Sequence, residues 1–387
     1  VLLSGIGANA YVDIEQIVQV AIDNEADVVI PGYGFLSENS NFAEKLAEAG
    51  IAFAGPSADS VEKFGLKHLA REIAVNSGVP IVPGTELIND VQELVSACND
   101  IGYPVILKAT AGGGGMGLKV CNSASEVETN FAEVQSRGAS LFSNTGVFVE
   151  KYIQNGRHIE VQIFGNGLGN IVTFGERECS IQRRHQKVIE ETPSPFVETL
   201  GKQYNLRKHL TECSKNLASS INYKSAGTVE FLVDDETGNF YFLEMNTRLQ
   251  VEHGISEMVY GMDLVYFMLA QADCELSNSG IDVALLKKSL KYDEQGVEIP
   301  SGHAIEVRVY AENPIKDFAP SPGILHYVEF PDQGPSSKGN YIVRVDHWIE
   351  TGGKVSPYFD PLLAKVMVWS PERTAANIIQ VLKDTKI

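Results

Sequence analysis

Two glutamates that face each other across a predicted hairpin are candidate metal ligands. Residues 228–246, TVEFLVDDETGNFYFLEMN, form two strand-like runs joined by the turn DDETGN, and this spacing sets Glu230 opposite Glu244. Opposed carboxylates repel unless a cation lies between them, and oxygen ligands suit Mg²⁺ or Mn²⁺ bound together with substrate phosphates. Asn246 is expected on the same face as Glu244. The alternative, an exposed acidic pair, agrees less well with the apolar neighbours.

A glycine-rich run between two predicted strands is a candidate phosphate-binding loop. The sequence KATAGGGGMGLKV places Gly112, Gly113, Gly114, Gly115 and Gly117 after Lys108. A dinucleotide-binding loop would lead into a helix, and a P-loop would need lysine where Leu118 stands. A flap between strands can instead close over phosphates with its backbone N–H groups, because glycine has no Cβ in the way. Lys108 is placed to reach the same phosphates; the alternative is a plain hairpin tip.

Charged side chains gather in three further segments, 176–191, 246–253 and 303–312. Singly, each side chain is typical of a solvated surface. Together they would surround a metal–nucleotide site with anion-binding groups, a carboxylate base and an arginine whose forked guanidinium suits planar anions. The residues concerned are Arg177, Arg183, Arg184, His185 and Lys187, then Arg248, Gln250, Glu252 and His253, and finally Glu306 and Arg308.

The composition indicates an ordinary globular protein and argues against two classes of partner. The chain has 387 residues and a net charge of −19, which disfavours binding to nucleic acid or to anionic membranes. No apolar run approaches the about 18 residues of a membrane span. The five cysteines are dispersed without metal-binding spacing, which favours reduced thiols and a cytoplasmic location.

Hydrophobic patterning divides the chain into three regions. Residues 1–81 alternate helices and short apolar strands, which is typical of a parallel α/β sheet, and one helix is expected over 60–78. Residues 82–152 read as a compact α+β unit that contains the glycine run. Strands dominate 153–387, with surface loops expected at 277–300 and 331–340. The first residue is Val1 and the last follows a helical pattern, so we expect a piece of a longer chain.

Five motifs, together with Lys67, closely resemble the biotin carboxylase component of biotin-dependent carboxylases. They are KATAGGGGMG, EKYIQNGRHIEVQ, ERECSIQRRHQKVIEETPSP, EMNTRLQVEH and GHAIEVRVYAENP, and they follow the family order over essentially the whole chain. A finer resemblance, to the urea carboxylase branch, is carried by FGLKHLAREIA, by YAENPIKDFAPSPG and by Ile30, where many acyl-CoA carboxylases have histidine. Two residues depart from the family: Gly254 replaces the usual proline, and Met116 replaces a cationic residue of the loop.

The resemblance implies an ATP-grasp fold of mixed α/β and α+β class. Residues 1–81 would be an N-terminal parallel α/β domain that lacks its opening strand. Residues 82–152 would be a small lid domain with the glycine loop. Residues 153–387 would be a larger, mainly antiparallel catalytic and C-terminal domain, shortened at its end.

The resemblance also implies a role for each matching residue. ATP would be bound by Lys67, Lys108, the glycines of the 112–117 loop, Glu150, Lys151, Ile153, His158, Gln182 and His185. The metal would be held by Glu230, Glu244 and Asn246. Bicarbonate would be held by Lys187, Arg248, Gln250 and the backbone of Val251, with Glu252 as general base. Biotin would contact Arg308, which stabilises its enolate, and Tyr33.

The implied activity is ATP- and bicarbonate-dependent carboxylation of biotin through carboxyphosphate, as the first half-reaction of a urea carboxylase. Biotin would arrive on a separate carrier domain, because none of the six methionines adjoins a lysine. A carboxyltransferase domain would take the product, and pairing into a homodimer is typical of the family. Three alternatives stay open: the biotin carboxylase of an acyl-CoA or pyruvate carboxylase, another ATP-grasp ligase that makes an acyl phosphate, and a non-catalytic nucleotide-binding fragment.

Overall fold

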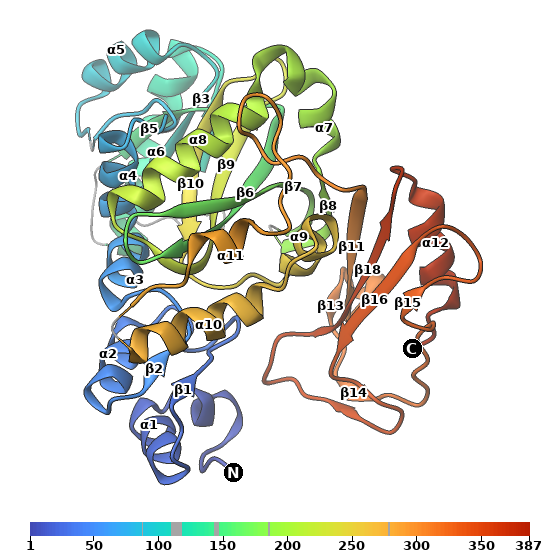
Figure 1. The fold of residues 1–387 in the computed structure, drawn as a ribbon. Helices are drawn as coiled ribbons and strands as arrows, with labels where there is room; N and C mark the ends of the chain where they lie inside the picture. Colours follow the sequence, from blue (N-terminus) through green and yellow to red (C-terminus); the bar gives the residue numbers. More distant parts are fainter. Residues whose placement is uncertain (87, 110–117, 143–146, 185, 278) are drawn as a thin grey trace. The chain divides into compact units, whose positions relative to one another are not determined.

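The computed structural model describes residues 1–387 except 87, 110–117, 143–146, 185 and 278 (Figure 1). The chain forms two compact units. The first unit comprises Val1–Val79, Arg157–Phe231 and Leu243–Ile387, and the second comprises Pro80–Gly156 and Leu232–Phe242.

The start of the first unit is a small α/β layer. Strands β1 (Val28–Val29) and β2 (Ala52–Phe53) pair in parallel, as the alternating pattern predicts. The layer also contains η1 (Gly7–Tyr11), α1 (Ile14–Asp23) and α2 (Ser40–Glu48). Both α1 and α2 begin at residues whose side chains accept a hydrogen bond from the first turn, Asp13 and Asn39. Their apolar faces pack around the buried Leu46.

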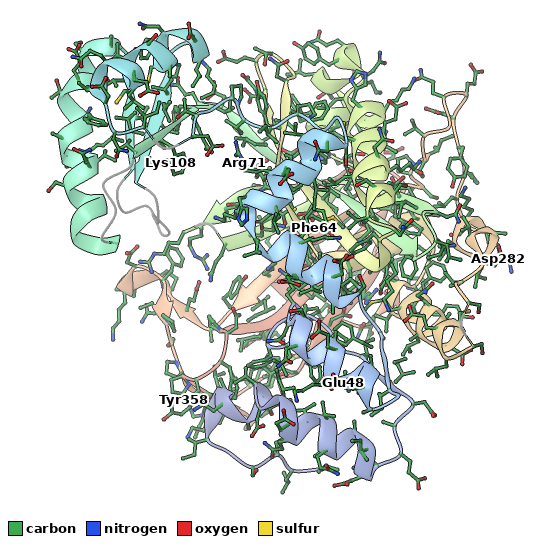
Figure 2. All side chains as sticks on the ribbon, turned by 90° about the vertical axis from the view of Figure 1, so that its left-hand side faces the viewer. Glu48, Phe64, Arg71, Lys108, Asp282 and Tyr358 are labelled. Carbon is green, nitrogen blue, oxygen red and sulfur yellow. The ribbon has the colours of Figure 1, made fainter. Side chains whose placement is uncertain are left out.

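The single helix expected over 60–78 is wrong, because the structure has two helices there. They are α3 (Ala58–Gly65) and α4 (Lys67–Asn76), and Phe64 and Arg71 are labelled on them in Figure 2. Leu66, between them, has an extended backbone with φ −101° and ψ 106°. Gly65 at the end of α3 favours such a break, since glycine is a poor helix former. The break makes Lys67 the first residue of α4.

A nine-stranded sheet forms the centre of the first unit, in the order β10-β9-β6-β7-β8-β11-β18-β16-β15. From β6 along the order to β15, each pair of neighbouring strands is antiparallel. The strands are β6 (Gly156–Asn166), β7 (Ile171–Arg183), β8 (Gln186–Thr192), β9 (Lys224–Asp234), β10 (Phe240–Asn246), β11 (His303–Tyr310), β15 (Gly334–Pro335), β16 (Ile342–His347) and β18 (Leu362–Ser370).

Helices cover this sheet, so several of its strands are buried on both faces. Residues 159–166 of β6 and 172–179 of β7 are buried throughout. Helix α8 (Leu206–Ser220) packs on β7, and α9 (His253–Tyr260) packs on β11 and β18 (Figure 1). The remaining elements are α7 (Pro195–Glu198), η2 (Leu200–Tyr204), α10 (Leu264–Leu276), β12 (Glu312–Asn313), η3 (Pro314–Lys316), β13 (Ala319–Pro320), β14 (Gly323–Ile324), β17 (Lys354–Val355) and α12 (Ala375–Asp384).

Both segments expected as surface loops contain regular structure, so that expectation is wrong in part. The segment 277–300 includes α11 (Val283–Lys287), whose Leu286 is buried in an apolar core of the unit. The segment 331–340 includes the short edge strand β15. Among the helices that the structure describes, none has the length and apolar character needed to cross a bilayer.

The second unit is a three-stranded antiparallel sheet covered by two helices. Its strands are β3 (Val105–Ala109), β4 (Leu118–Cys121) and β5 (Val147–Lys151), in the order β4-β3-β5. Helices α5 (Val91–Ile101) and α6 (Ala124–Phe142) pack on this sheet and enclose a separate apolar core. The unit contains the segment 82–152 expected from the sequence and adds Leu232–Phe242, which includes the turn of the β9–β10 hairpin.

Candidate active site

Lys187, on β8, lies at the centre of a buried group of charges in the first unit. Its Nζ donates to Glu160, to Glu230 at 2.9 Å and to Glu252 at 2.7 Å. Burial works against the charged form, but Glu160 and Glu252 raise the pKa of Lys187 well above its usual value. We call Lys187, Glu160, Glu230, Glu252 and Arg308 the charge cluster. Lys187 thus joins carboxylates from β6, β9 and the start of α9.

Both carboxylate oxygens of Glu230 have close polar partners. Oε1 accepts from Nδ2 of Asn246 and from Nε2 of Gln250, both at 2.8 Å, and Oε2 lies 2.6 Å from Nε2 of His158. Burial works against ionisation, but His158 and Lys187 hold the pKa of Glu230 well below its usual range. The predicted metal ligands Glu230 and Asn246 are therefore in direct contact, and the carboxylate is ionised.

Glu244 differs from Glu230 in being exposed. Within the residues that the structure describes, no hydrogen bond or ion pair engages its carboxylate. Partial desolvation, followed by the charge of Glu230, raises the pKa of Glu244, and Lys67 acts in the opposite direction. Glu244 and Asn246 also line a cavity of about 240 Å³. Two interacting carboxylates, one without a cationic partner, fit a divalent cation. Such an ion would compete with Arg248, because Nη2 of Arg248 donates to Oδ1 of Asn246 at 3.1 Å.

Glu252, the predicted general base, is the N-cap residue of α9 and is 2% exposed. Its Oε1 accepts from Lys187, and its Oε2 accepts from Nη2 of Arg308 at 3.0 Å. Burial works against ionisation, but Lys187 and Arg308 hold the pKa of Glu252 well below its usual value. The carboxylate is therefore ionised, as a proton acceptor must be, and it touches both predicted partners.

Apart from Lys187 on β8, the predicted bicarbonate-binding residues follow β10 as one stretch of chain. Arg248 pairs with Glu38, with Nε 3.0 Å from Oε2. Gln250 is buried and accepts a hydrogen bond from Nη2 of Arg177 at 3.1 Å. The structure therefore brings Arg248, Gln250 and Glu252 together with Lys187 in one unit.

Three of the cationic residues in 176–191 are not free to bind anions. Arg177 lies directly opposite Glu160 on the neighbouring strand and is 0% exposed. Its guanidinium donates to Glu160, Gln162, Thr228, Gln250 and Ser256. Arg183 pairs with Glu312, and Arg184 pairs with Asp317. Arg177 therefore holds side chains from several elements of the site in place. The sequence alone did not reveal this role.

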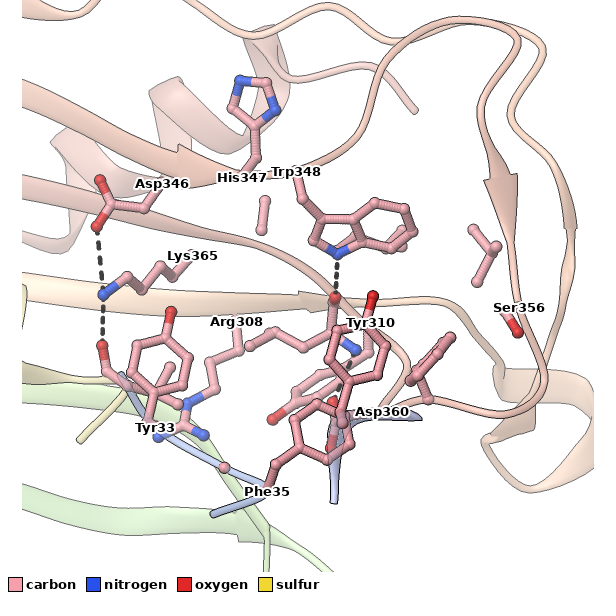
Figure 3. Close-up of a pocket in the computed structure, with 18 of the residues that line it drawn as sticks. Tyr33, Phe35, Arg308, Tyr310, Asp346, His347, Trp348, Ser356, Asp360 and Lys365 are labelled. Atoms are coloured by element: carbon pink, nitrogen blue, oxygen red, sulfur yellow. Dashed lines mark hydrogen bonds and ion pairs between the residues drawn. The ribbon is translucent and has the colours of Figure 1, made fainter. Parts of the chain in front are cut away.

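Arg308 and Tyr33, the predicted biotin contacts, line one cavity of about 1190 Å³ within the first unit (Figure 3). Arg248 and Val251 line it as well. Nη2 of Arg308 lies 2.7 Å from Oε1 of Glu190. The cavity thus joins the residues expected to hold bicarbonate with those expected to hold biotin.

The second unit carries four of the predicted nucleotide contacts. Lys108 on β3 pairs with Glu150 on β5, with Nζ 2.5 Å from Oε2. Nζ of Lys151 donates to the carbonyl oxygens of Gly102 and Tyr103, at 3.1 and 2.9 Å. Ile153 follows β5 and is partly buried.

Two other nucleotide contacts, His158 and Gln182, lie in the first unit. Nε2 of Gln182 is 3.2 Å from Nδ1 of His158. The predicted contacts Gly112, Gly113, Gly114, Gly115, Gly117 and His185 lie outside the described residues.

The sequence did not single out Glu160, Glu190 and Lys365, all of which are at most 2% exposed beside the site. Glu190 and Glu306 are direct partners across β8 and β11. Burial, followed by Glu306, raises the pKa of Glu190, and burial raises the pKa of Glu306 to about 7. The period-2 alternation of β11 placed Glu306 on one face with Arg308, but no pattern indicated that both faces of the strand are covered.

Gly254 on α9 packs closely against a buried methionine. A Cβ atom at this position would lie 2.4 Å from Sδ of Met367 on β18, which is closer than van der Waals contact. Met367 is 0% exposed and fills the space beside α9. Gly254 and Met367 therefore fit as a pair.

Family models match three consecutive parts of the chain. The biotin carboxylase N-terminal domain matches residues 1–61, the ATP-binding domain of the carbamoyl-phosphate synthase L chain matches 67–276, and the biotin carboxylase C-terminal domain matches 306–387.

Known proteins resemble the chain over nearly its full length. A putative urea carboxylase of Emericella nidulans is 55% identical over 99% of this chain, which spans 30% of that relative's length. Biotin carboxylase 1 of Bacillus subtilis is 42% identical over 95% of this chain and 76% of its own. The solved biotin carboxylase domain of a thermophilic 2-oxoglutarate carboxylase bound to bicarbonate has a TM-score of 0.87 and 35% identity, and it covers 100% of this chain and 80% of its own. These similarities and the ATP-grasp fold show that the chain belongs to the biotin carboxylase family.

Proposed function

We propose that this chain carboxylates biotin with ATP and bicarbonate, as the first half-reaction of a urea carboxylase. The observation that carries the proposal is Glu252, an ionised and buried carboxylate in contact with both Lys187 and Arg308. One carboxylate base between two cations suits a reaction in which an anion must be deprotonated and must attack another anion.

In the first step, Glu252 takes the proton of bicarbonate as a bicarbonate oxygen attacks the γ-phosphorus of ATP. The bond from γ-phosphorus to the bridging oxygen breaks, ADP leaves, and carboxyphosphate forms. Lys187 and Arg248 offset the repulsion between the two anions. A divalent ion held by Glu230, Glu244 and Asn246 would neutralise charge on the transferring phosphoryl group.

In the second step, the chain has to protect a labile intermediate from water until biotin reacts. Carboxyphosphate breaks into CO₂ and phosphate, the phosphate takes the N1′ proton of biotin, and CO₂ joins N1′. Arg308 stabilises the enolate oxygen of biotin, and Tyr33 lies beside the ring. The second unit, with Lys108, Glu150, Lys151, Ile153 and the 112–117 segment, would serve as the lid that holds ATP and excludes water.

Biotin, the carrier domain and the carboxyltransferase would be supplied by the rest of a longer protein. The identity with a putative urea carboxylase supports urea as the final acceptor. A homodimer and a cytoplasmic location remain proposals from the same resemblance.

The test is steady-state ATP cleavage with MgATP, bicarbonate and free biotin as acceptor. We expect cleavage that depends on bicarbonate and is accelerated by biotin. Cleavage at the same rate without bicarbonate would refute the proposal. If MgATP raises the melting temperature and no turnover follows, the chain is a non-catalytic nucleotide-binding fragment instead.

A further inference from the structure

Lys365 is a buried cation that the proposed reaction does not use. It stands on β18, is 2% exposed, and lies directly opposite Arg308 on β11 and Asp346 on β16. Two like charges on neighbouring strands repel, and a buried ammonium loses its hydration. A lysine in this position therefore needs specific partners that compensate both costs.

The partners of Lys365 connect it to the peptide that precedes the general base. Nζ donates to the carbonyl oxygen of Val251 at 2.6 Å and lies 3.2 Å from Oδ2 of Asp346 (Figure 3). It also lies 5.7 Å from the centre of the Tyr33 ring. Asp346 is itself held by Arg344 through contacts of 2.9 Å to both oxygens.

Fixing the Val251 oxygen constrains the residue that follows it. The peptide bond is planar, so the oxygen of Val251 and the nitrogen of Glu252 move as one rigid group. On the other side, Gln250 is fixed by Arg177, and its carbonyl oxygen lies 2.7 Å from Nδ1 of His253. Without Lys365, the segment 250–253 would keep its anchor at Gln250 and lose its anchor at Val251.

From these contacts we propose that Lys365 is a positioning residue, with Asp346 as its counterion, that holds the Val251–Glu252 peptide in place for bicarbonate. The inference rests on the proposed function, because it assigns Glu252 as the base and Val251 as part of the bicarbonate site. Lys365 itself acts through the backbone and need not touch a substrate.

The activity test compares Lys365→Met with Lys215→Met. Methionine keeps the length of the side chain and removes the charge and the donor. Lys215 is a matched control because it pairs with the buried Glu298, 3.1 Å away, and does not line the cavity. We expect Lys365→Met to lower kcat/KM for bicarbonate about 10- to 100-fold, the range for one charged hydrogen bond, and to change the MgATP dissociation constant less than about twofold.

Two further variants separate positioning from general structural loss. Lys365→Arg keeps a donor and a charge, so it should recover part of the bicarbonate kcat/KM. Asp346→Asn keeps the size of the counterion and should lower the same parameter about 2- to 5-fold, even if Lys365→Met proves unstable. An unchanged bicarbonate kcat/KM in Lys365→Met, or a change confined to the KM for biotin, would overturn the proposal.

Amide hydrogen exchange tests the same inference without turnover. In the substrate-free protein, peptides covering residues 250–256 should exchange at least about tenfold faster in Lys365→Met than in Lys215→Met. Equal exchange would refute the positioning role. If the unmodified chain shows no bicarbonate-dependent cleavage but the exchange result holds, the proposed function fails and the structural role of Lys365 stands.

Discussion

The charge cluster in the first unit and the nucleotide contacts in the second are built in different ways. Around Lys187, the carboxylates of Glu160, Glu230 and Glu252 are at most 4% exposed and paired. In the second unit, Lys108 and Glu150 form a pair whose side chains are 28% and 15% exposed, on a sheet of three strands. In the first region the charges are buried and paired with one another, whereas in the second the ion pair is more exposed to solvent.

The contrast indicates that ATP binding and the chemical step depend on different parts of the chain. A buried network positions its groups before substrate arrives, so that losing one member leaves the others uncompensated. A partly exposed ion pair is worth less and is easily replaced by contacts to phosphate. Variants of the cluster should therefore affect the chemical step, and variants of the second unit should affect ATP affinity.

The largest effect is expected from Glu252→Gln. Glutamine has nearly the same shape but accepts no proton, so bicarbonate-dependent ATP cleavage should fall at least about 100-fold. Equilibrium binding of MgATP, measured by calorimetry, should stay within about twofold. Glu298→Gln is the control, because Glu298 is equally buried and contacts Thr173 away from the cluster. Loss of MgATP binding in Glu252→Gln would show that the carboxylate is structural.

Arg308→Ala should reduce carboxylation of biotin by about 100-fold, since an enolate stabiliser acts mainly in the transition state. MgATP binding should be retained, and bicarbonate-dependent cleavage without biotin should fall less than carboxylation. Arg373→Ala is the matched control, because Arg373 forms a two-point pair with Glu191 and does not line the cavity. Equal losses of MgATP binding and of carboxylation would show that Arg308 does not act by stabilising the biotin enolate.

In the second unit, Lys108→Met should raise the KM for ATP about tenfold and leave the KM for bicarbonate nearly unchanged. Lys119→Met removes an ammonium from the adjacent strand, where Lys119 pairs with Glu133 at 3.0 Å, and should have little effect. A rise confined to the KM for bicarbonate would contradict the assignment of Lys108 to ATP binding.

The smallest effect is a change in the pH dependence of stability on replacing Glu306. Its pKa is raised to about 7 by burial, so between the ordinary value near 4.5 and about 7 the folded state holds a proton that the unfolded state has released. Stability should therefore fall as pH rises through this window. Glu306→Gln should flatten that slope by an amount on the order of 1 kcal/mol per pH unit, measured by urea unfolding at several pH values. An unchanged slope would mean that Glu306 is ionised throughout.

The hairpin that carries two of the predicted metal ligands could be predicted because its residue types follow a local pattern. The turn DDETGN joins β9 and β10, which are neighbours in the sheet, and burial, followed by the charge of Glu230, raises the pKa of Glu244. The parallel pairing of β1 and β2 followed from the alternation of helices and apolar runs.

What the sequence could not reveal depends on contacts between distant strands. Arg177 reads as a surface cation until β6, β9 and α9 enclose it. Lys365 approaches Val251 across 114 positions of the chain, and no periodicity encodes that contact. The break at Leu66 and the helix α11 were missed because short-range propensity is weak compared with tertiary packing.

The most direct test of the account follows an oxygen atom from bicarbonate. The chain is incubated with MgATP, free biotin and ¹⁸O-labelled bicarbonate in ordinary water, and the released phosphate is analysed by mass spectrometry. If bicarbonate attacks the γ-phosphorus, each phosphate carries one bicarbonate oxygen, and Glu252→Gln suppresses its formation. Phosphate whose new oxygen comes from water would contradict the account.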